Sequence, residues 1–319
     1  MVYVLGTDEA GYGPNLGPLC IAATAWEMPD GADVESLYER LASVICSELS
    51  EAGEKLTIAD SKALYKAGGS LELLERGVLV ALACLGRSPR CWREIWEALD
   101  RECLSQIDDQ PWHQEFEETL PLHSDLAAIA AAAAMLQAGC GEAAAGLVEL
   151  QASILFPAAF NQAVNGCGNK AEVLSLTTLR LARRVLESLP PGGALVFCDK
   201  HGGRTYYAAL LQHIFPEELV IVRRETAALA VYQVQHAGRT IEFRFQPKGE
   251  QHLPTALASM TAKYLRELAM RPFNAFWQRH IPNLKATAGY PTDARRFCDD
   301  ISRARRKLKI ADHLLWRTR

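Results

Sequence analysis

Residues 1–14 read MVYVLGTDEAGYGP, an apolar segment that ends in two adjacent acids and a turn rich in glycine and proline. Residues 1–7 alternate and are rich in β-formers, which predicts a short strand. The apolar run over residues 19–26 follows the turn, and we expect it to be the partner strand of a hairpin. The chain therefore begins with two paired strands, and Asp8 and Glu9 lie where the first one ends.

The two acids are candidates for a ligand-binding site. Neighbouring residues of a strand point to opposite faces, but at a strand end or bulge both side chains can reach one ion. Gly11 and Gly13, which flank Tyr12, let the backbone pass close to a ligand and offer N–H groups to a phosphate. The alternative is a solvated turn that binds nothing.

Further candidates follow a second strand and lie on a helix. Residues 194–198 (ALVFC) predict a buried strand that ends at Asp199, and the carboxyl ends of such strands are where ligands usually bind in α/β proteins. The alternative is that Asp199 caps a helix. Ser259, Lys263 and Glu267 share one face of the helix expected over residues 255–270, because they are spaced by four. The alternative for that face is an exposed Lys–Glu pair.

Together these positions supply carboxylates from two strand ends and one helix. Carboxylates gathered in one cleft repel each other unless cations neutralise them. Oxygen ligands with few nitrogens or thiols suit Mg²⁺ or Mn²⁺. Two such ions ~4 Å apart clamp a phosphodiester, since one activates water and the other steadies the leaving oxygen. The pattern therefore favours a two-metal site that acts on phosphodiesters.

The remaining strand and helix patterns alternate without an internal repeat, which predicts an α/β protein. We expect residues 1–270 to form a catalytic domain and residues 271–319 a helical, basic tail region. Residues 88–145 are interpreted as a helical insertion, in which Trp92 and Trp96 either stack on bases or seal a small core. Further helices are expected over residues 34–50, 172–189 and 293–315, and further strands over residues 147–156, 219–223, 232–235 and 240–245.

Charge is distributed unevenly along the chain, whose net charge is −4. Residues 295–319 contain nine Lys/Arg and three Asp/Glu, whereas residues 94–125 contain ten acids and one arginine. A basic tail on an acidic body can be a nucleic-acid handle. The alternative is a solvated amphipathic helix.

Composition restricts the class of protein. Apolar residues at 49% and charged residues at 23% are typical of a globular chain and exclude a disordered one. Neither an apolar run of ~20 residues nor an export signal is present, so we expect a cytoplasmic protein that does not contact a membrane. Nine cysteines without a CxxC pair indicate free thiols and argue against a zinc site or a disulfide framework.

Several segments resemble the motifs of ribonuclease HII, the type 2 ribonuclease H. Residues 6–14 (GTDEAGYGP), followed by Gly17-Pro18, resemble the opening signature of that family. The other matching segments keep the family's order and are Asp60-Ser61-Lys62, residues 169–189, residues 196–199, Lys248-Gly249-Glu250, residues 258–267 and residues 289–292. Residues 88–145 and 223–245 are unmatched.

The resemblance implies a ribonuclease H-like fold with a mixed five-stranded sheet flanked by helices. It also implies metal-dependent endonucleolytic cleavage of RNA paired with DNA, with Mg²⁺ or Mn²⁺ as cofactor and an RNA–DNA hybrid or ribonucleotide-containing DNA as partner. The implied catalytic and metal-ligating residues are Asp8, Glu9, Asp199 and Glu267. The implied substrate-binding residues are Gly11, Tyr12, Gly13, Ser61, Lys62, Ser259, Lys263 and Tyr290.

The chain departs from the family pattern at two of these positions. Tyr12 replaces the arginine of the Gly-Arg-Gly with which family members sense the ribonucleotide, so a cation with five donors is exchanged for a stacking ring. We therefore expect altered recognition of RNA–DNA junctions. Glu267 replaces an aspartate and reaches one methylene further. Two alternatives stay open: a nuclease for other structured nucleic acid, and a nucleic-acid-binding module without turnover.

Overall fold

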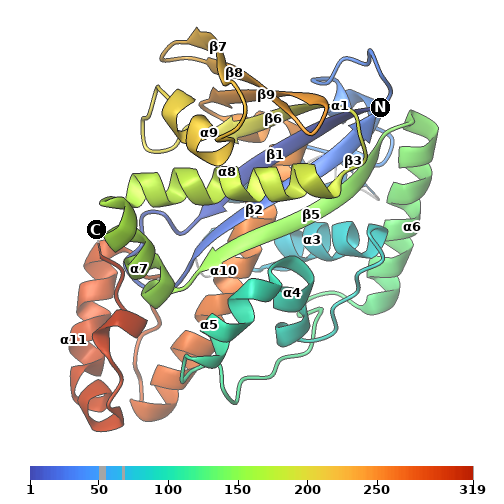
Figure 1. Cartoon of the computed structure of the whole chain (residues 1–319). Coiled ribbons are helices and arrows are strands. Elements are labelled where there is room, and N and C mark those ends of the chain that lie inside the picture. The colour runs from blue at the N-terminus through green and yellow to red at the C-terminus, as the bar shows by residue number, and fades with distance from the viewer. Residues whose placement is uncertain (50–54, 67–68, 319) are drawn as a thin grey trace.

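The computed structural model describes residues 1–49, 55–66 and 69–318. Across these residues the central feature is a seven-stranded sheet in the order β5-β2-β1-β6-β9-β8-β7 (Figure 1). Its strands are β1 (Val2–Ala10), β2 (Leu19–Met28), β5 (Gly146–Leu155), β6 (Gly193–Asp199), β7 (Ile221–Glu225), β8 (Ala230–His236) and β9 (Arg239–Gln246). A separate pair of short strands is formed by β3 (Ile45–Cys46) and β4 (Leu56–Thr57).

The large sheet is mixed, as expected. β1 is antiparallel to β2 and parallel to β6, and β6 is parallel to β9. The sheet has seven strands rather than five, because β8 and β7 continue it beyond β9 as antiparallel neighbours. The parallel β1–β6 pair is the feature that matters for the site, since it brings the carboxyl ends of both strands to the same edge.

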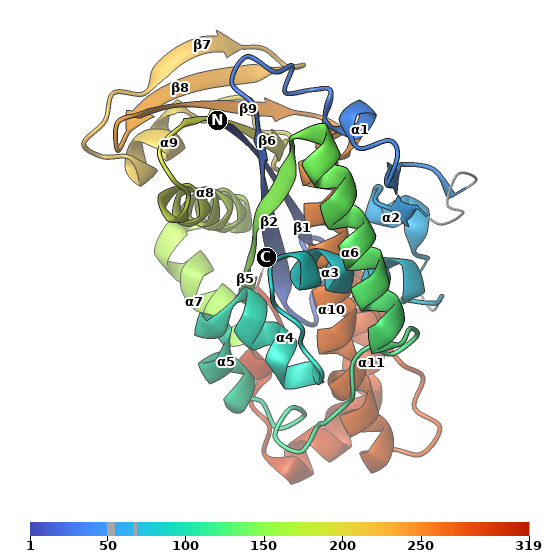
Figure 2. The same cartoon turned by 90° about the vertical axis from the view of Figure 1, so that its right-hand side faces the viewer.

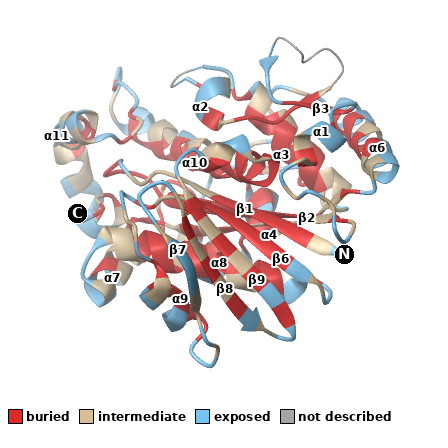
Figure 3. Ribbon diagram, turned by 90° about the horizontal axis from the view of Figure 1, so that it is seen from above, coloured by how far each residue is buried: buried red, intermediate tan, exposed pale blue. Residues whose placement is uncertain are grey.

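Helices cover both faces of the sheet, which confirms the α/β class (Figure 2). One layer consists of α10 (Leu253–His280), α3 (Glu72–Cys84) and α6 (Leu126–Ala143), and the other of α7 (Pro157–Cys167), α8 (Lys170–Ser188) and α9 (Ala208–Ile214). β1 contributes to both layers because its side chains alternate: Val4 packs on the α10 side, and Tyr3 and Leu5 pack on the α8 side. In Figure 3 the strands in the middle of the sheet are buried over most of their length.

The helix expected to end before Pro272 continues to His280, so this prediction is wrong. A proline inside a helix has no N–H to donate to the carbonyl four residues earlier, here that of Leu268. The indole nitrogen of Trp92 donates to that carbonyl instead, over 2.9 Å. A contact from another part of the chain thus satisfies the group that Pro272 leaves open, and α10 runs on past it.

The C-terminal region is helical, as expected. It contains α11 (Pro291–Leu308), whose Phe297 and Ile301 pack with the second half of α10 in a separate hydrophobic cluster. The stretch over residues 34–50 is different from the prediction. It holds only the short helix α1 (Leu37–Arg40) before β3, and its last residue lies outside the described ones. Ile45 begins β3 and Val44 directly precedes it. Both residues are β-branched and favour strands over helices.

Residues 88–145 contain α4 (Trp92–Leu99), α5 (Leu104–Asp108) and α6. Trp92 and Trp96 are fully buried and pack edge to face with ring centroids 5.3 Å apart, which confirms that they seal a core. Among the described helices α6 alone is long and apolar enough to cross a membrane by length and composition. This is weak evidence, since core helices of soluble proteins pass the same test; Ile129, Leu136 and their neighbours bury one face of α6.

The remaining short helix α2 (Ser61–Leu64) begins directly after Asp60, whose carboxylate caps it by accepting from the Lys62 backbone N–H at 3.0 Å. α2 contacts the N-terminal half of α10. It therefore presents Ser61 and Lys62 close to the edge at which β1 and β6 end.

Candidate active site

Three of the four carboxylates expected at the site meet at the shared edge of β1 and β6. Thr7 of β1 is paired in parallel with Cys198 of β6, so Asp8 and Asp199 follow side by side. Asp8 lies on the α10 face of β1, like Val4, and Glu9 follows on the opposite face at the end of the strand. The sequence pattern of two acids after one strand and one after another is thus brought together by strand pairing.

The electrostatics of this edge are unfavourable for three anions. Burial raises the pKa of Asp8 well above its ordinary value, and the charge of Asp199 raises it further. Burial also raises the pKa of Glu9, and Asp8 and Asp199 both add to the shift. These carboxylates are half-buried and repel one another, so their ionised forms need a compensating positive charge.

Two serine hydroxyls and one lysine lie beside the acids and interact with them. Ser259 of α10 donates a hydrogen bond to Asp8, and its Oγ lies 3.0 Å from that of Ser61 on α2. Because Ser259 donates to the carboxylate, Ser61 donates to Ser259. Burial lowers the pKa of Lys62, but Asp60, Asp8 and further acids outweigh this and leave it raised. The structure therefore places these three substrate-binding candidates beside the carboxylates.

Glu250 is one of those further acids, and the list of site residues drawn from the sequence missed it. Its charge, like those of Asp8 and Asp199, contributes to the raised pKa of Lys62. A signal was present, because Glu250 belongs to the Lys248-Gly249-Glu250 segment that resembles a family motif.

The fourth expected ligand, Glu267, has different partners. Its carboxylate accepts hydrogen bonds from the Lys263 ammonium and, over 3.0 Å, from the Tyr65 hydroxyl. Ser259, which faces Asp8, lies eight residues earlier on α10, or about 12 Å along a helix axis. Lys263 and Glu267 therefore form an ion pair, as the alternative prediction had it, but the pair is half-buried rather than exposed. Lys263 Nζ also lies 4.7 Å from the centre of the Tyr65 ring.

The carboxylates of Asp8, Glu9 and Asp199 are candidate ligands for a metal ion. Within residues 1–49, 55–66 and 69–318, no group of three or more His, Cys, Asp or Glu side chains is arranged to hold a metal ion. The chemistry of the donors nevertheless fits Mg²⁺ or Mn²⁺, because Asp8, Glu9 and Asp199 offer carboxylate oxygens. Burial, together with the charge of neighbouring acids, raises the pKa values of Asp8 and Glu9, and a bound cation would favour their ionised forms.

The turn after Glu9 has a backbone that depends on glycine. Gly11 has φ +93°, and a Cβ there would lie 2.5 Å from the Pro18 carbonyl oxygen. A Cβ on Gly13 would lie 3.9 Å from the ring of Tyr290, so that tyrosine borders the turn, and its own side chain is 56% exposed. Tyr290 thus borders the turn with its ring open to solvent, and its role in substrate binding stays a prediction.

Two cationic side chains, Lys170 and Arg204, act on Tyr12. Lys170 Nζ lies 4.6 Å above the ring centroid. Burial and the charge of Glu9 raise the pKa of Tyr12, whereas the charge of Arg204 lowers it. Arg204 follows Asp199 in the loop after β6, and its buried Nε has no hydrogen-bond partner among the described residues. Positive charge is therefore present beside the tyrosine that replaces the family's arginine, and sequence reasoning missed its source at Arg204.

Two buried arginines hold the turn in place. Arg266 of α10 donates to the carbonyls of Pro18 and Leu16 at 2.7 and 3.1 Å. Arg317, near the C-terminus, donates to the carbonyls of Gly11 and Pro14. Arg266 lies within a segment that resembles a family motif, whereas nothing in the sequence distinguishes Arg317 from the other basic residues of the tail.

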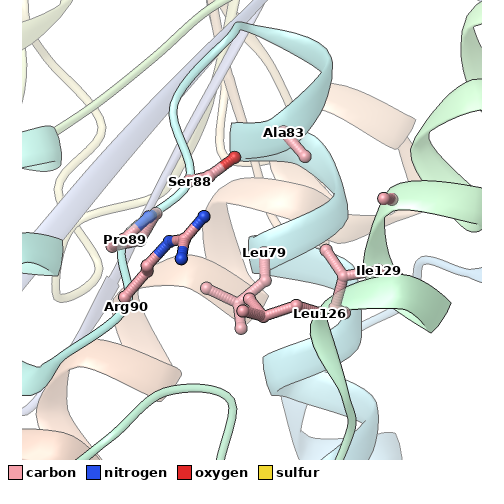
Figure 4. A pocket seen from close by; sticks show the side chains of 8 residues that line it. Leu79, Ala83, Ser88, Pro89, Arg90, Leu126 and Ile129 are labelled. Atoms are coloured by element: carbon pink, nitrogen blue, oxygen red, sulfur yellow. The ribbon is translucent and has the colours of Figure 1, made fainter.

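A cavity of about 170 Å³ lies between α3 and α6, away from the carboxylate edge (Figure 4). It is mostly apolar, with Arg90 and Ser88 at one side, and the acids described above do not line it. It has none of the chemistry of the carboxylate edge. Its lining residues are Leu79, Ala83, Ser88, Pro89, Arg90, Leu126, Ile129 and Ala130.

Comparison with known proteins gives structural similarity only. No protein-family model and no curated protein sequence matches the chain. Among solved structures, ribonuclease H2 from Pyrococcus horikoshii OT3 aligns with a TM-score of 0.47 and 13% identity over 98% of this chain and 92% of that one. The ribonuclease HII that was solved with PCNA from Archaeoglobus fulgidus aligns with a TM-score of 0.42 and 13% identity, over 99% and 94%. Bst ribonuclease HIII in complex with Mn²⁺ aligns with a TM-score of 0.44 and 12% identity, over 99% and 66%.

Proposed function

We propose that this protein is a metal-dependent endonuclease of the type 2 ribonuclease H kind, which cleaves RNA in RNA–DNA hybrids. One observation carries the proposal: parallel pairing of β1 with β6 places Asp8 and Asp199 side by side, with Glu9 adjacent. The residues match the order of the ribonuclease HII motifs, and the fold is an α/β sheet flanked by helices, as that resemblance implies.

Asp8, Glu9 and Asp199 would hold Mg²⁺ or Mn²⁺, and Glu267 is the fourth candidate ligand. When bound, such ions activate a water molecule for attack on phosphorus and stabilise the leaving oxygen. Glu267 now accepts hydrogen bonds from Lys263 and Tyr65, so its participation requires an exchange of those partners.

The chain's own residues have separate tasks in this proposal. Ser61 and Ser259 orient the Asp8 carboxylate through a hydrogen-bonded chain. Lys62 offsets part of the negative charge of the acids. The backbone of Gly11–Gly13 and the exposed ring of Tyr290 contact the ribose and phosphates of the substrate strand.

Tyr12 favours a substrate preference that differs from that of the family. Lys170 lies over its ring and the charge of Arg204 acts on it, so cations would reach the strand from two other segments rather than from the turn itself. We propose cleavage within uniform RNA–DNA hybrid with weak recognition of a single ribonucleotide in DNA. A nuclease for other structured nucleic acid is the second candidate. We also propose a cytoplasmic location, which accords with the unpaired cysteines.

A cleavage assay with Mg²⁺ and with Mn²⁺ tests the proposal. Its substrates are a uniform RNA–DNA hybrid, a DNA duplex with one ribonucleotide, and plain duplex DNA. The proposal expects cutting of the hybrid, little cutting at the single ribonucleotide and none of plain DNA. Cutting of plain DNA or of a DNA junction would favour the second candidate. A folded protein that binds hybrid and cuts nothing with either metal would replace both enzymes with a binding module.

A further inference from the structure

A small cavity lies on the side of the Gly11–Pro14 turn that faces α7 and α8. Its volume is about 20 Å³, roughly the space of one water-sized group. Its lining includes Tyr12, Asn15, Phe160, Lys170 and Arg317. Two of these five side chains carry a positive charge and none carries a negative charge.

Arg317 is buried, and only one of its three guanidinium nitrogens has a hydrogen-bond partner among the described residues. Its side chain is 1% exposed, and its guanidinium lies 4.7 Å above the Phe160 ring. One nitrogen, Nη2, donates to the Gly11 and Pro14 carbonyls. The other two, Nε and Nη1, are buried and have no hydrogen-bond partner within the described part of the chain.

The charge of this arginine is also unbalanced. Burial lowers the pKa of Arg317 to about 9, and the nearby charge of Arg266 contributes in the same direction. At neutral pH the guanidinium is therefore a buried cation whose surroundings disfavour its charge. A buried charge is costly unless it is paired, so the cavity beside it favours an anion.

The walls of the cavity suit an anion whose oxygen atoms accept hydrogen bonds. Lys170 is the first residue of α8, and the N-terminus of a helix carries a partial positive charge. Arg317, Lys170 and the start of α8 thus present positive charge to one small space.

We propose that this cavity is a phosphate subsite, in which one phosphate oxygen enters and accepts hydrogen bonds from the open nitrogens of Arg317 while Lys170 faces the rest of the group. Because the cavity adjoins Tyr12, the phosphate of a nucleic-acid strand there would fix the strand relative to the carboxylate edge. That use of the subsite rests on the proposed nuclease function. Phosphate binding itself requires neither metal nor the carboxylates.

The test measures binding of inorganic phosphate to the full chain in EDTA, by calorimetry, for the wild type, Lys170→Gln and Arg317→Lys. The proposal expects saturable binding that is weakened about tenfold or more by each substitution, because each removes or shortens a charged donor. Lys285→Gln, which changes an exposed lysine that does not line the cavity, is the matched control and should bind like the wild type. Thermal unfolding and circular dichroism check that each variant is folded; Lys170→Gln keeps the proposal testable if Arg317→Lys loosens the turn.

Two competition arms identify the source of the phosphate. An oligonucleotide without terminal phosphates that displaces inorganic phosphate indicates an internal phosphodiester, and displacement only by a 5′-phosphorylated oligonucleotide indicates a terminal phosphate. The proposal is overturned if the wild type shows no saturable binding, or if Lys170→Gln and folded Arg317→Lys bind as well as Lys285→Gln. The Asp8→Asn variant should bind phosphate normally, so failure of the nuclease proposal and failure of this subsite give different results.

Discussion

The two sides of the loop that follows β1 have opposite electrostatic requirements. On one side burial and the neighbouring carboxylates raise the pKa values of Asp8 and Glu9, which lie beside Asp199. On the other side Arg317 is a buried cation with open donors, next to Lys170. Only a few residues of chain, Ala10 to Tyr12, separate the acids from the basic cavity.

The two groups of charges do not neutralise each other by direct pairing. Within the described residues, the ion pairs recorded near the site join Lys263 with Glu267, and none joins Asp8 or Glu9 to Arg317. Groups with strongly shifted pKa values, such as Asp8, Glu9 and Arg317, cluster at functional sites. Under the two proposals above, the acidic side would hold cations and the basic side an anion, as a phosphodiester with its metal ions would require.

The largest expected effect is on the acidic side. Asp8→Asn should reduce hybrid cleavage by roughly 10³-fold, about 4 kcal/mol of transition-state stabilisation, because it replaces a carboxylate that would hold the metal with a neutral amide. Cleavage rates at saturating Mg²⁺ measure this loss, and the exposed Asp109→Asn is the control with the same change of charge. Undiminished cleavage by folded Asp8→Asn would remove Asp8 from the mechanism.

The next effect concerns the turn that separates the two sides. Gly11→Ala should destabilise the protein by about 3 kcal/mol, since alanine disfavours φ +93° and its Cβ would meet the Pro18 carbonyl at 2.5 Å. Gly31 also has a positive φ, +77°, but a Cβ there meets nothing within 4 Å. Gly31→Ala should therefore cost only about 1 kcal/mol. Urea denaturation compares the two, and equal losses would show that close packing at Gly11 is unimportant.

Metal-free stability should depend on pH through the acidic side. The folded pKa values of Asp8 and Glu9 are raised, so the folded state binds more protons than the unfolded state above pH about 4. In EDTA the free energy of unfolding should fall as pH rises from about 4 towards neutrality, and Asp8→Asn should reduce that slope.

Mg²⁺ should restore the lost stability, by about 2.7 kcal/mol at a concentration of 100 times its Kd. Thermal unfolding with and without Mg²⁺ at pH 5 and 8 measures both trends. A stability that rises with pH over this range, or that ignores Mg²⁺ at pH 8, would contradict the account of the acidic side.

The smallest expected effect is at Glu267. Because its carboxylate is paired with Lys263 and Tyr65, Glu267→Gln should reduce cleavage by only about tenfold, about 1.4 kcal/mol. Glu142→Gln, at an exposed position on α6, is the matched control. A loss as large as that of Asp8→Asn would show that Glu267 leaves its partners and joins the acids when metal binds.

The sequence predicted those features that depend on local pattern. The first two strands, β6 with Asp199 at its end, and α8 were all expected within a few residues of their bounds. Asp8 and Asp199 were expected at the ends of two strands, and the parallel pairing of β1 with β6, which was not predicted, brings them to one edge. The helical C-terminal region was also expected, although the helix predicted over residues 293–315 ends earlier, at Leu308.

The features that were missed depend on contacts between distant segments. Pro272 was expected to end α10, and only the Trp92 indole, far away in sequence, explains why it does not. Arg317 differs from the other basic residues of the tail because residues near the C-terminus fold back onto the Gly11–Pro14 turn, where Arg317 donates to two carbonyls. The strands expected over residues 219–223, 232–235 and 240–245 are present as β7, β8 and β9, so only the count of five strands implied by the resemblance was too low.

A crystal structure of the protein with Mn²⁺, located by its anomalous scattering, tests the central claim most directly. The account predicts Mn²⁺ ligated by carboxylate oxygens of Asp8 and Asp199, with Glu9 in contact, and loss of that signal in Asp8→Asn. Absence of Mn²⁺ from this edge at millimolar concentration, or its binding elsewhere with the edge unchanged, would contradict the claim that these acids form a metal site.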